Sequence, residues 1–252
     1  MRRVPPEASY QYNDSFMHTG PRKKRKSRQE TPSTSALLER AINELMGTGW
    51  ITECQQILCE AMNTFPFTSF EVLCLGLGSP SCSRDARAQL AFLVSTCDSC
   101  GIDRRKVSIY DPVFTEDDVK LLRDLQFNCL TDDKQAKYPL LNPTLLFMPH
   151  CDRNLYENVL RANWTQERLQ NMLLIANCFS EYVDNIPSHK LTVESPCLTR
   201  IAPYLESRDL PALISPATAF NNTSIQLVKR EALAGLDQKA SFWQLPELPS
   251  EN

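Results

Sequence analysis

The sequence has no long apolar run, and this shortage excludes two classes of protein. No apolar stretch reaches the ~18 residues that a transmembrane helix needs, and the first residues lack the apolar core of a secretory signal peptide. We therefore expect an intracellular protein. Hydrophobic residues make up 42% and charged residues 23% of the 252 residues, as in an ordinary folded protein rather than a disordered one.

The sequence also lacks a second closely spaced pair of cysteines. Cys97 and Cys100 have the spacing of a zinc knuckle, but a structural zinc site needs another such pair. No aromatic residue precedes Cys97 in the thioredoxin manner, which argues against a redox motif. We therefore predict no metal site. The ten cysteines, several of them within apolar runs, are predicted to be reduced thiols in a reducing compartment.

Positive charge is concentrated at the N-terminus. The first 30 residues contain eight of the 27 basic residues and three of the 30 acidic ones, so the rest of the chain has a net charge of about −8. An acidic folded part would repel nucleic acid, and we predict no direct nucleic-acid binding by it. The tail has too few aliphatic residues to form a core, so we predict a disordered basic tail over residues 1–31.

The basic run 21–28 within this tail has two interpretations. It fits a nuclear-import signal, and it equally fits a solvated charged tail. We expect a cytoplasmic protein, with nuclear import dependent on which interpretation holds.

The periodicity predicts helices first and then alternating strands and helices. Apolar stripes predict one helix from Thr31-Pro32 to Gly47 and another over 51–62, followed by Phe65-Pro66. Further helices are predicted around Leu90–Cys97, from Glu116 to Leu125 and after Asp152. Apolar runs predict strands at 70–75, 106–111, 127–130, 144–148, 172–177, 213–214 and 224–228.

The alternation of strands and helices predicts the fold class. We expect a Rossmann-like α/β fold, with a mostly parallel sheet covered by helices on both faces. An N-terminal helical pair at 32–64 precedes the α/β domain, which is predicted to span 65–252.

Polar residues follow several of the predicted strands, where ligands bind in open α/β sheets. Gly76 and Gly78 with Ser79 follow the first strand, although Ser81 stands where a dinucleotide fingerprint has its third glycine. This segment is therefore a ligand loop or a plain tight turn. Asp111 ends the second strand and is placed either to bind ribose hydroxyls or to start a turn.

The junction at 144–164 is the most informative segment, because an apolar run breaks at Pro149 and a helical pattern follows Asp152. His150 and Cys151 lie at this break, as pocket residues rather than as a catalytic pair, since adjacent side chains usually point apart. The amides that are suited to orient a polar ligand, or to cap helices and form turns, are Asn158, Asn163, Asn177, Asn221 and Asn222. The candidate ligand-binding residues are Gly76, Gly78, Ser79, Asp111, His150 and Asn177.

Several blocks together resemble the SRR-like family, named for "sensitivity to red light reduced". These blocks, in family order, are 74–79, 110–114, 147–151, 155–158, 161–164 and 219–225. The resemblance covers about Phe65 to Val228. It implies a single α/β domain without an established catalytic residue, linked in plants to light signalling and the circadian clock. In animals it implies roles in clock-gene expression and in the control of haem biosynthesis.

The sequence departs from the family pattern at three positions. Asn222 and Gln226 replace an acid and a histidine, so proton transfer is not expected at these two positions. Ala176 replaces a glycine, so a close ligand contact there would meet an extra methyl group. No cysteine is followed by proline, the dipeptide of many haem-responsive regulators, although His150 and Cys151 are of residue types that ligate haem iron.

Two function classes therefore remain. The residues favour a regulatory protein with a small-ligand or nucleotide-binding crevice over an enzyme. The alternative is a transferase that uses a nucleotide-containing cofactor such as S-adenosylmethionine at Gly76 and Asp111. The cofactor and the protein partners are not identified by the sequence.

Overall fold

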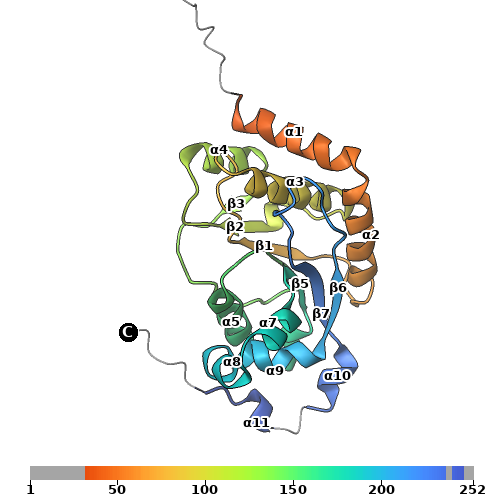
Figure 1. Ribbon diagram of the computed structural model, residues 1–252, viewed down its shortest axis with the longest axis vertical. Helices are drawn as coiled ribbons and strands as arrows, with labels where there is room; N and C mark the ends of the chain where they lie inside the picture. The colour runs from red at the N-terminus through yellow and green to blue at the C-terminus, as the bar shows by residue number, and fades with distance from the viewer. Residues whose placement is uncertain (1–31, 237–239, 247–252) are drawn as a thin grey trace, which may run out of the picture. The chain divides into compact units, whose positions relative to one another are not determined.

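The computed structural model describes residues 32–236 and 240–246, and a seven-stranded sheet lies at their centre (Figure 1). The strands are β1 Glu71–Leu75, β2 Val107–Tyr110, β3 Asn128–Cys129, β4 Thr144–Met148, β5 Met172–Asn177, β6 Leu205–Asp209 and β7 Thr223–Val228. Their order in the sheet is β3-β2-β1-β4-β5-β7-β6. Strands β1 to β5 are parallel, and β7 is antiparallel to both β5 and β6. The mostly parallel sheet confirms the predicted fold class.

Helices cover both faces of the sheet, as predicted (Figure 1). On the first face, α2 Trp50–Met62, α3 Arg84–Ser99 and α4 Glu116–Asp124 lie against the sheet, and α1 Thr34–Gly47 packs on the outer side of α3. The second face is covered by α5 Arg153–Ala162, α7 Phe179–Asn185, α8 Ser188–Glu194 and α9 Pro196–Ile201. The short helices α6 Gln166–Leu169, α10 Arg230–Ala234 and α11 Ala240–Trp243 complete the described chain, with 3-10 turns at Arg104–Lys106 and Ala202–Tyr204.

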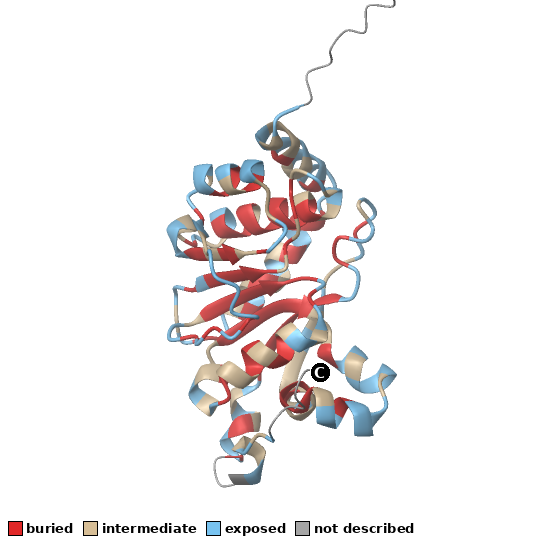
Figure 2. Cartoon of the chain, turned by 90° about the vertical axis from the view of Figure 1, so that its left-hand side faces the viewer, coloured by how far each residue is buried: buried red, intermediate tan, exposed pale blue. Residues whose placement is uncertain are grey.

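The period-two geometry of the strands separates two apolar cores. In β1, Val72 and Cys74 face the core beneath α1 to α4, whereas Leu73 and Leu75 face the core beneath α5 and α9. All five residues of β4 are buried, as expected for a central strand that is covered on both sides. Figure 2 shows the buried sheet between helices whose outer surfaces are exposed.

The two N-terminal helices form where the apolar stripes predict them. Ser33 accepts a hydrogen bond from the Ala36 N–H and caps α1, so this helix begins slightly later than the predicted Thr31-Pro32 start. The turn after α1 requires Gly49, which has a φ of 72°. Leu38 and Leu58 from this pair pack in the same core as the first face of the sheet. The predicted boundary between 32–64 and 65–252 stays a prediction, and the predicted tail over 1–31 lies outside the described residues.

The prediction was wrong about the strand at 213–214. That segment is a loop in which Ile214 is 90% exposed, and the edge strand is β6, which lies earlier in the chain. Strand β6 contains Glu206, Arg208 and Asp209, so it has no apolar run and no clear alternation for a pattern to detect. The helices α7, α8 and α9 were also not predicted, because each is only six or seven residues long.

Candidate functional site

Strands β2, β1, β4 and β5 end at one edge of the sheet, and the candidate residues follow them there. Gly76 and Gly78 both have positive φ, 69° and 76°, so both use the backbone freedom of glycine. Asp111 follows β2, His150 follows β4, and Asn177 ends β5. The structure therefore places the candidates along a common edge, but it divides them into two groups with different surroundings.

The glycine turn is bound by a carboxylate of the protein itself. Asp111 Oδ2 accepts a hydrogen bond of 2.7 Å from the Gly78 N–H, and Asp111 Oδ1 accepts one of 3.0 Å from the Val113 N–H. Asp111 is 9% exposed. The backbone donor that a phosphate or ribose ligand would use at Gly78 is therefore occupied by Asp111.

A second carboxylate, Asp118 on α4, holds the next part of the turn. Asp118 is fully buried and accepts hydrogen bonds from the Ser79 hydroxyl at 2.6 Å, the Ser81 N–H at 2.7 Å and the Thr115 N–H at 2.9 Å. Burial raises the pKa of Asp118, but these hydrogen bonds outweigh burial and leave the pKa lowered. A phosphate at this turn would be repelled by two carboxylates.

Cys151 fills the space next to Gly76, where β1 and β4 lie side by side. A Cβ atom added at Gly76 would overlap with the Cys151 sulfur, so only glycine fits there. The Cys151 thiol donates to the Leu75 carbonyl oxygen at 3.3 Å, and burial raises its pKa to about 12. Cys151 is therefore a packing residue and a poor nucleophile.

His150 and Asn177 form the second group. His150 has a left-handed φ of 59°, and its N–H donates to Asn177 Oδ1 at 3.1 Å. His150 Nε2 lies 3.0 Å from the Ala219 carbonyl oxygen, and Asn177 Nδ2 donates to the Tyr182 hydroxyl at 2.9 Å. His150 is exposed and Cys151 is buried, so the two adjacent side chains point apart, as predicted.

Tyr156 joins the ends of β4 and β5 and is not among the candidate ligand-binding residues named from the sequence. It is fully buried, and its hydroxyl donates to the Met148 carbonyl oxygen at 2.7 Å. The Tyr156 hydroxyl oxygen itself accepts hydrogen bonds from the backbone N–H groups of Cys151 at 3.2 Å and Asn177 at 3.3 Å. The helical spacing of Tyr156 on the buried side of α5 was the available signal.

An open groove lies beside His150 and Asn177, around the end of β5 and the start of β7. Its volume is about 580 Å³. The polar lining residues are Cys178, Ser180, Glu181, Ser207, Asp209, Asn221, Asn222 and Thr223. Glu181 and Asp209 are the charged lining residues, so the groove is acidic. The amides Asn221 and Asn222 were predicted as ligand-orienting residues, whereas Ser207 and Asp209 were missed because β6 was missed.

The strand ends do not meet at one common mouth. Ser79, Tyr110, Cys151 and Ser180 each follow or end a strand, and from the sequence they are expected to face one ligand. Of these four, Ser180 lines the groove, whereas Ser79 and Cys151 are buried and bound to other parts of the chain. The open part of the edge therefore lies toward β6, away from the glycine turn.

Two of the three departures from the family pattern, Asn222 and Gln226, have structural explanations here. Gln226 is buried, accepts from the Phe179 N–H at 3.0 Å and donates to the Asn177 carbonyl oxygen at 2.9 Å. Asn222 has a left-handed φ of 56°, a conformation that asparagine tolerates better than most residues. Both amides therefore shape the backbone beside the groove.

Two other buried polar residues in the same region support packing. Glu157 accepts from the Cys197 and Leu198 N–H groups at 2.9 and 3.1 Å and so caps α9. Asn163 accepts from the Leu140 N–H at 2.7 Å and anchors the segment between β3 and β4. Neither side chain lines the groove.

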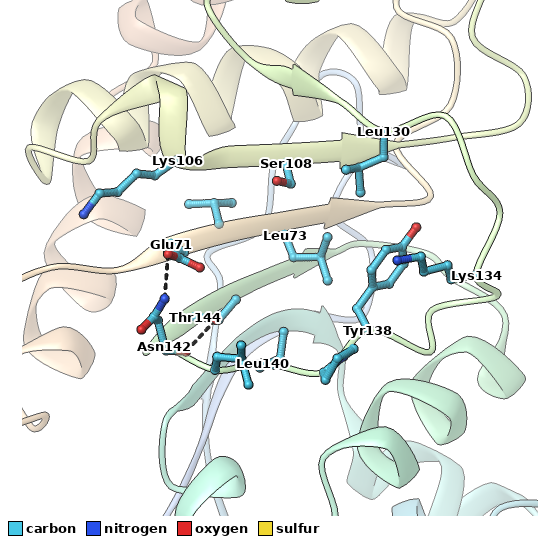
Figure 3. Close-up of a pocket in the computed structure, with 13 residues that line it drawn as sticks. Glu71, Leu73, Lys106, Ser108, Leu130, Lys134, Tyr138, Leu140, Asn142 and Thr144 are labelled. Atoms are coloured by element: carbon cyan, nitrogen blue, oxygen red, sulfur yellow. Dashed lines mark hydrogen bonds between the residues drawn. The ribbon is translucent and has the colours of Figure 1, made fainter.

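A second cavity of about 270 Å³ lies on the sheet face near the start of β1 (Figure 3). It exists because the connection between β3 and β4 contains no helix, so that part of the face has only a loop over it. Its apolar residues include Leu73, Leu130 and Leu140, and Lys106 and Lys134 lie at its rim. It is smaller than the groove and lies away from the carboxyl ends of the strands, so the groove is the better candidate site.

Comparisons with known proteins agree with the family resemblance. A sequence model described as the SRR1 domain matches residues 54–227. An SRR1-like protein of Mus musculus is 30% identical over 131 residues, which cover 52% of this chain and 53% of the mouse protein. An SRR1-like protein of Drosophila melanogaster is 28% identical over 210 residues, 82% of this chain and 72% of the fly protein.

A plant relative gives the family its name. The Arabidopsis thaliana protein Sensitivity to Red Light Reduced 1 is 32% identical over 119 residues, 47% of this chain and 43% of the plant protein. The match spans about half the length of the mouse and plant relatives. Within residues 32–236 and 240–246, no helix combines the length and apolar character that crossing a bilayer requires. The domain match covers more than half of the chain, which therefore belongs to the SRR1 family.

Proposed function

We propose that this protein is a non-enzymatic regulator that binds a small polar ligand in the groove beside β5, β6 and β7. The observation that supports the proposal is the groove itself, a space of about 580 Å³ lined by hydroxyl, amide and carboxylate groups. Such a mixture of donors and acceptors orients a polar ligand. The groove also lies at the sheet edge where α/β proteins bind ligands.

The charges at this edge favour a neutral or cationic ligand. Glu181 and Asp209 line the groove, and within residues 32–236 and 240–246 no lysine, arginine or histidine lines it. Asp111 and Asp118 bind the glycine turn. In this proposal His150 and Asn177 position the loop beside the groove, while Gly76, Gly78, Ser79 and Asp111 form a closed structural turn. A phosphate-bearing nucleotide would meet negative charge at either place.

Filling the groove is expected to abolish ligand binding. Ala217 lines the groove and is exposed, so Ala217→Trp should occupy the space without removing a hydrogen bond of the groove. The test is thermal unfolding of the full chain with a panel of neutral, cationic and anionic metabolites, including adenosine, S-adenosylmethionine and ATP. A ligand at about 100 times its Kd stabilises the native state by about 2.7 kcal/mol, or about 5–10 °C in Tm.

The matched control places the same side chain in the other cavity. Leu141 is 79% exposed and lines the second cavity, so Leu141→Trp should leave the ligand-induced shift intact. We expect shifts from neutral or cationic compounds that Ala217→Trp removes. A shift that Ala217→Trp retains, or no shift from any compound, would argue against the groove as a ligand site.

A transferase that uses S-adenosylmethionine is the second candidate. The specific observation in its favour is the acidic edge, because the sulfonium cofactor is cationic and has no phosphate. Asp111, however, would have to bind the cofactor while it also binds Gly78. Stabilisation by S-adenosylmethionine together with transfer of its labelled methyl group would support the enzyme. Stabilisation without transfer supports the regulator.

The biological setting that we propose is the control of clock-gene expression and haem biosynthesis, with action in the nucleus as well as the cytoplasm. Deletion of residues 21–28 should lower nuclear accumulation, because it removes a run of six basic residues. It should leave thermal stability unchanged. The full chain and the chain without residues 21–28 are each to be expressed in cells that lack the protein. Imaging then measures nuclear accumulation, a reporter measures clock-gene expression, and the haem content of the cells is determined. An unchanged distribution would mean that the run is solvated charge.

A further inference from the structure

The groove contains a cysteine whose surroundings differ from those of the buried thiols. Cys178 precedes α7, is partly exposed, and lines the groove. Its sulfur lies 3.1 Å from the Ser180 Oγ and 3.6 Å from the Ser207 Oγ. Both hydroxyl groups can donate to the sulfur, so they favour the thiolate over the neutral thiol.

A third hydroxyl group completes this environment. Ser224 is 1% exposed, and its Oγ has no hydrogen-bond partner of ordinary length among the described residues. Ser224 lies on β7 opposite Ala176 of β5, two residues before Cys178. Burial raises the pKa of Cys178, but the hydroxyl groups of Ser180, Ser207 and Ser224 outweigh burial and leave the pKa lowered. A buried hydroxyl group without a partner of ordinary length thus lies close in the fold to Cys178, the cysteine among the described residues that line the groove.

Other cysteines provide the contrast. Burial raises the pKa of Cys54, Cys97 and Cys151 to about 12 in each case. Hydrogen bonds from Ser79 and Ser81 lower the pKa of Cys82, but that thiol is exposed and does not line the groove. Cys178 thus combines a stabilised thiolate with a space that a small molecule can enter.

The groove charges define which small molecules would enter. Glu181 and Asp209 are its charged lining residues, so positive charge on an incoming molecule is attracted and negative charge is repelled. The side chains around the sulfur are small, because serines occupy positions 180 and 207. The lining therefore suits a compact molecule that bears an amine.

We propose that Cys178 is a site of reversible thiol–disulfide exchange with a small cationic disulfide that enters the groove. The Cys178 thiolate attacks one sulfur of the small disulfide, and a new S–S bond forms as the old one breaks. The other half leaves as a thiolate and takes up a proton. The protein thiol is oxidised, the departing sulfur is reduced, and no further oxidant is needed. This inference rests on the groove of the proposed function and assigns a means of regulation to it.

The test exposes the reduced full chain to cystamine, which is cationic, or to glutathione disulfide, which is anionic. Intact mass and peptide mapping follow each cysteine with time. We expect Cys178 to react with cystamine before Cys82 and the buried thiols, and faster than with glutathione disulfide. Dithiothreitol should reverse the product, and Cys178→Ser should remove it. Equal rates at Cys178 and Cys82, or no adduct at Cys178, would overturn the proposal.

Two further variants separate thiolate stabilisation from simple access. Ser224→Ala removes a buried hydroxyl group, so it should slow exchange near neutral pH and have little effect at high pH, where the thiol is already ionised. Asp209→Asn removes one negative charge from the groove, so it should lower the ratio of the reaction rate with cystamine to the rate with glutathione disulfide. Selective exchange in a protein that binds no panel compound would contradict only the proposed ligand function. Ligand binding without exchange would contradict only the assignment of Cys178.

Discussion

Replacing Gly76 by alanine is expected to destabilise the protein by about 2–5 kcal/mol. The new Cβ atom would overlap with the Cys151 sulfur, and overpacking of this kind costs about 1–3 kcal/mol. The φ of 69° at Gly76 adds about 1–2 kcal/mol of backbone strain for a residue with a side chain. Urea unfolding of the two proteins, followed by circular dichroism, measures the difference.

Gly101 provides the matched control for the steric part. Its φ is 64°, but an added Cβ atom there would meet no atom within 4 Å. Gly101→Ala should therefore lower the free energy of unfolding by about 1–2 kcal/mol, because only backbone strain is added. Cys151→Ala should partly rescue Gly76→Ala, because it removes the overlapping sulfur. A Gly76→Ala protein no less stable than Gly101→Ala would show that β1 and β4 do not meet in this way.

The second large effect is expected at Asp118. Asp118→Ala would leave the Ser81 and Thr115 N–H groups and the Ser79 hydroxyl without their acceptor. A fully buried donor left unpaired costs about 1–3 kcal/mol, but only Ser79 is buried, whereas Ser81 and Thr115 are partly exposed and can bind water, so we expect a loss of about 2–4 kcal/mol in total. The measurement is again the free energy of unfolding, and Asp117→Ala is the control because Asp117 is the exposed neighbour on α4.

The pH dependence of stability should report the same carboxylate. Because the pKa of Asp118 is lowered in the folded protein, its contribution is present above the unfolded pKa of about 4 and is lost as pH falls through the folded pKa. The difference in stability between wild type and Asp118→Ala should therefore be largest near neutral pH and shrink below about pH 4. A difference that does not depend on pH would mean that Asp118 is not ionised in the folded protein.

The central strands and their covering helices were predictable because burial imposes clear periodicity. Strands β1, β4 and β5 are continuous apolar runs, and α1 and α2 each have one apolar stripe. Strand β6 was not predictable, because an exposed edge strand needs no apolar pattern. Helices α7 to α9 have only about two turns each and pack through a few residues each, so the sequence contains no sustained helical pattern for them.

The sequence predicted which residues lie at the edge of the sheet where the strands end, but not which of them are free to bind a ligand. The sequence placed Gly76, Asp111, His150 and Asn177 at one edge, because parallel strands end together. Which donors are already occupied depends on contacts between distant segments, such as Asp118 with Ser79. No spacing within a single segment encodes such a contact. The shape of the groove depends in the same way on β6, whose position the sequence pattern did not indicate.

Native mass spectrometry of the purified full chain tests the ligand groove most directly. Wild type and Ala217→Trp are to be prepared side by side under conditions that retain non-covalent ligands. We expect a fraction of the wild-type protein to carry a small neutral or cationic compound that is absent from Ala217→Trp. Two unliganded proteins, or a compound that both proteins retain, would contradict the proposal that this groove is the ligand site.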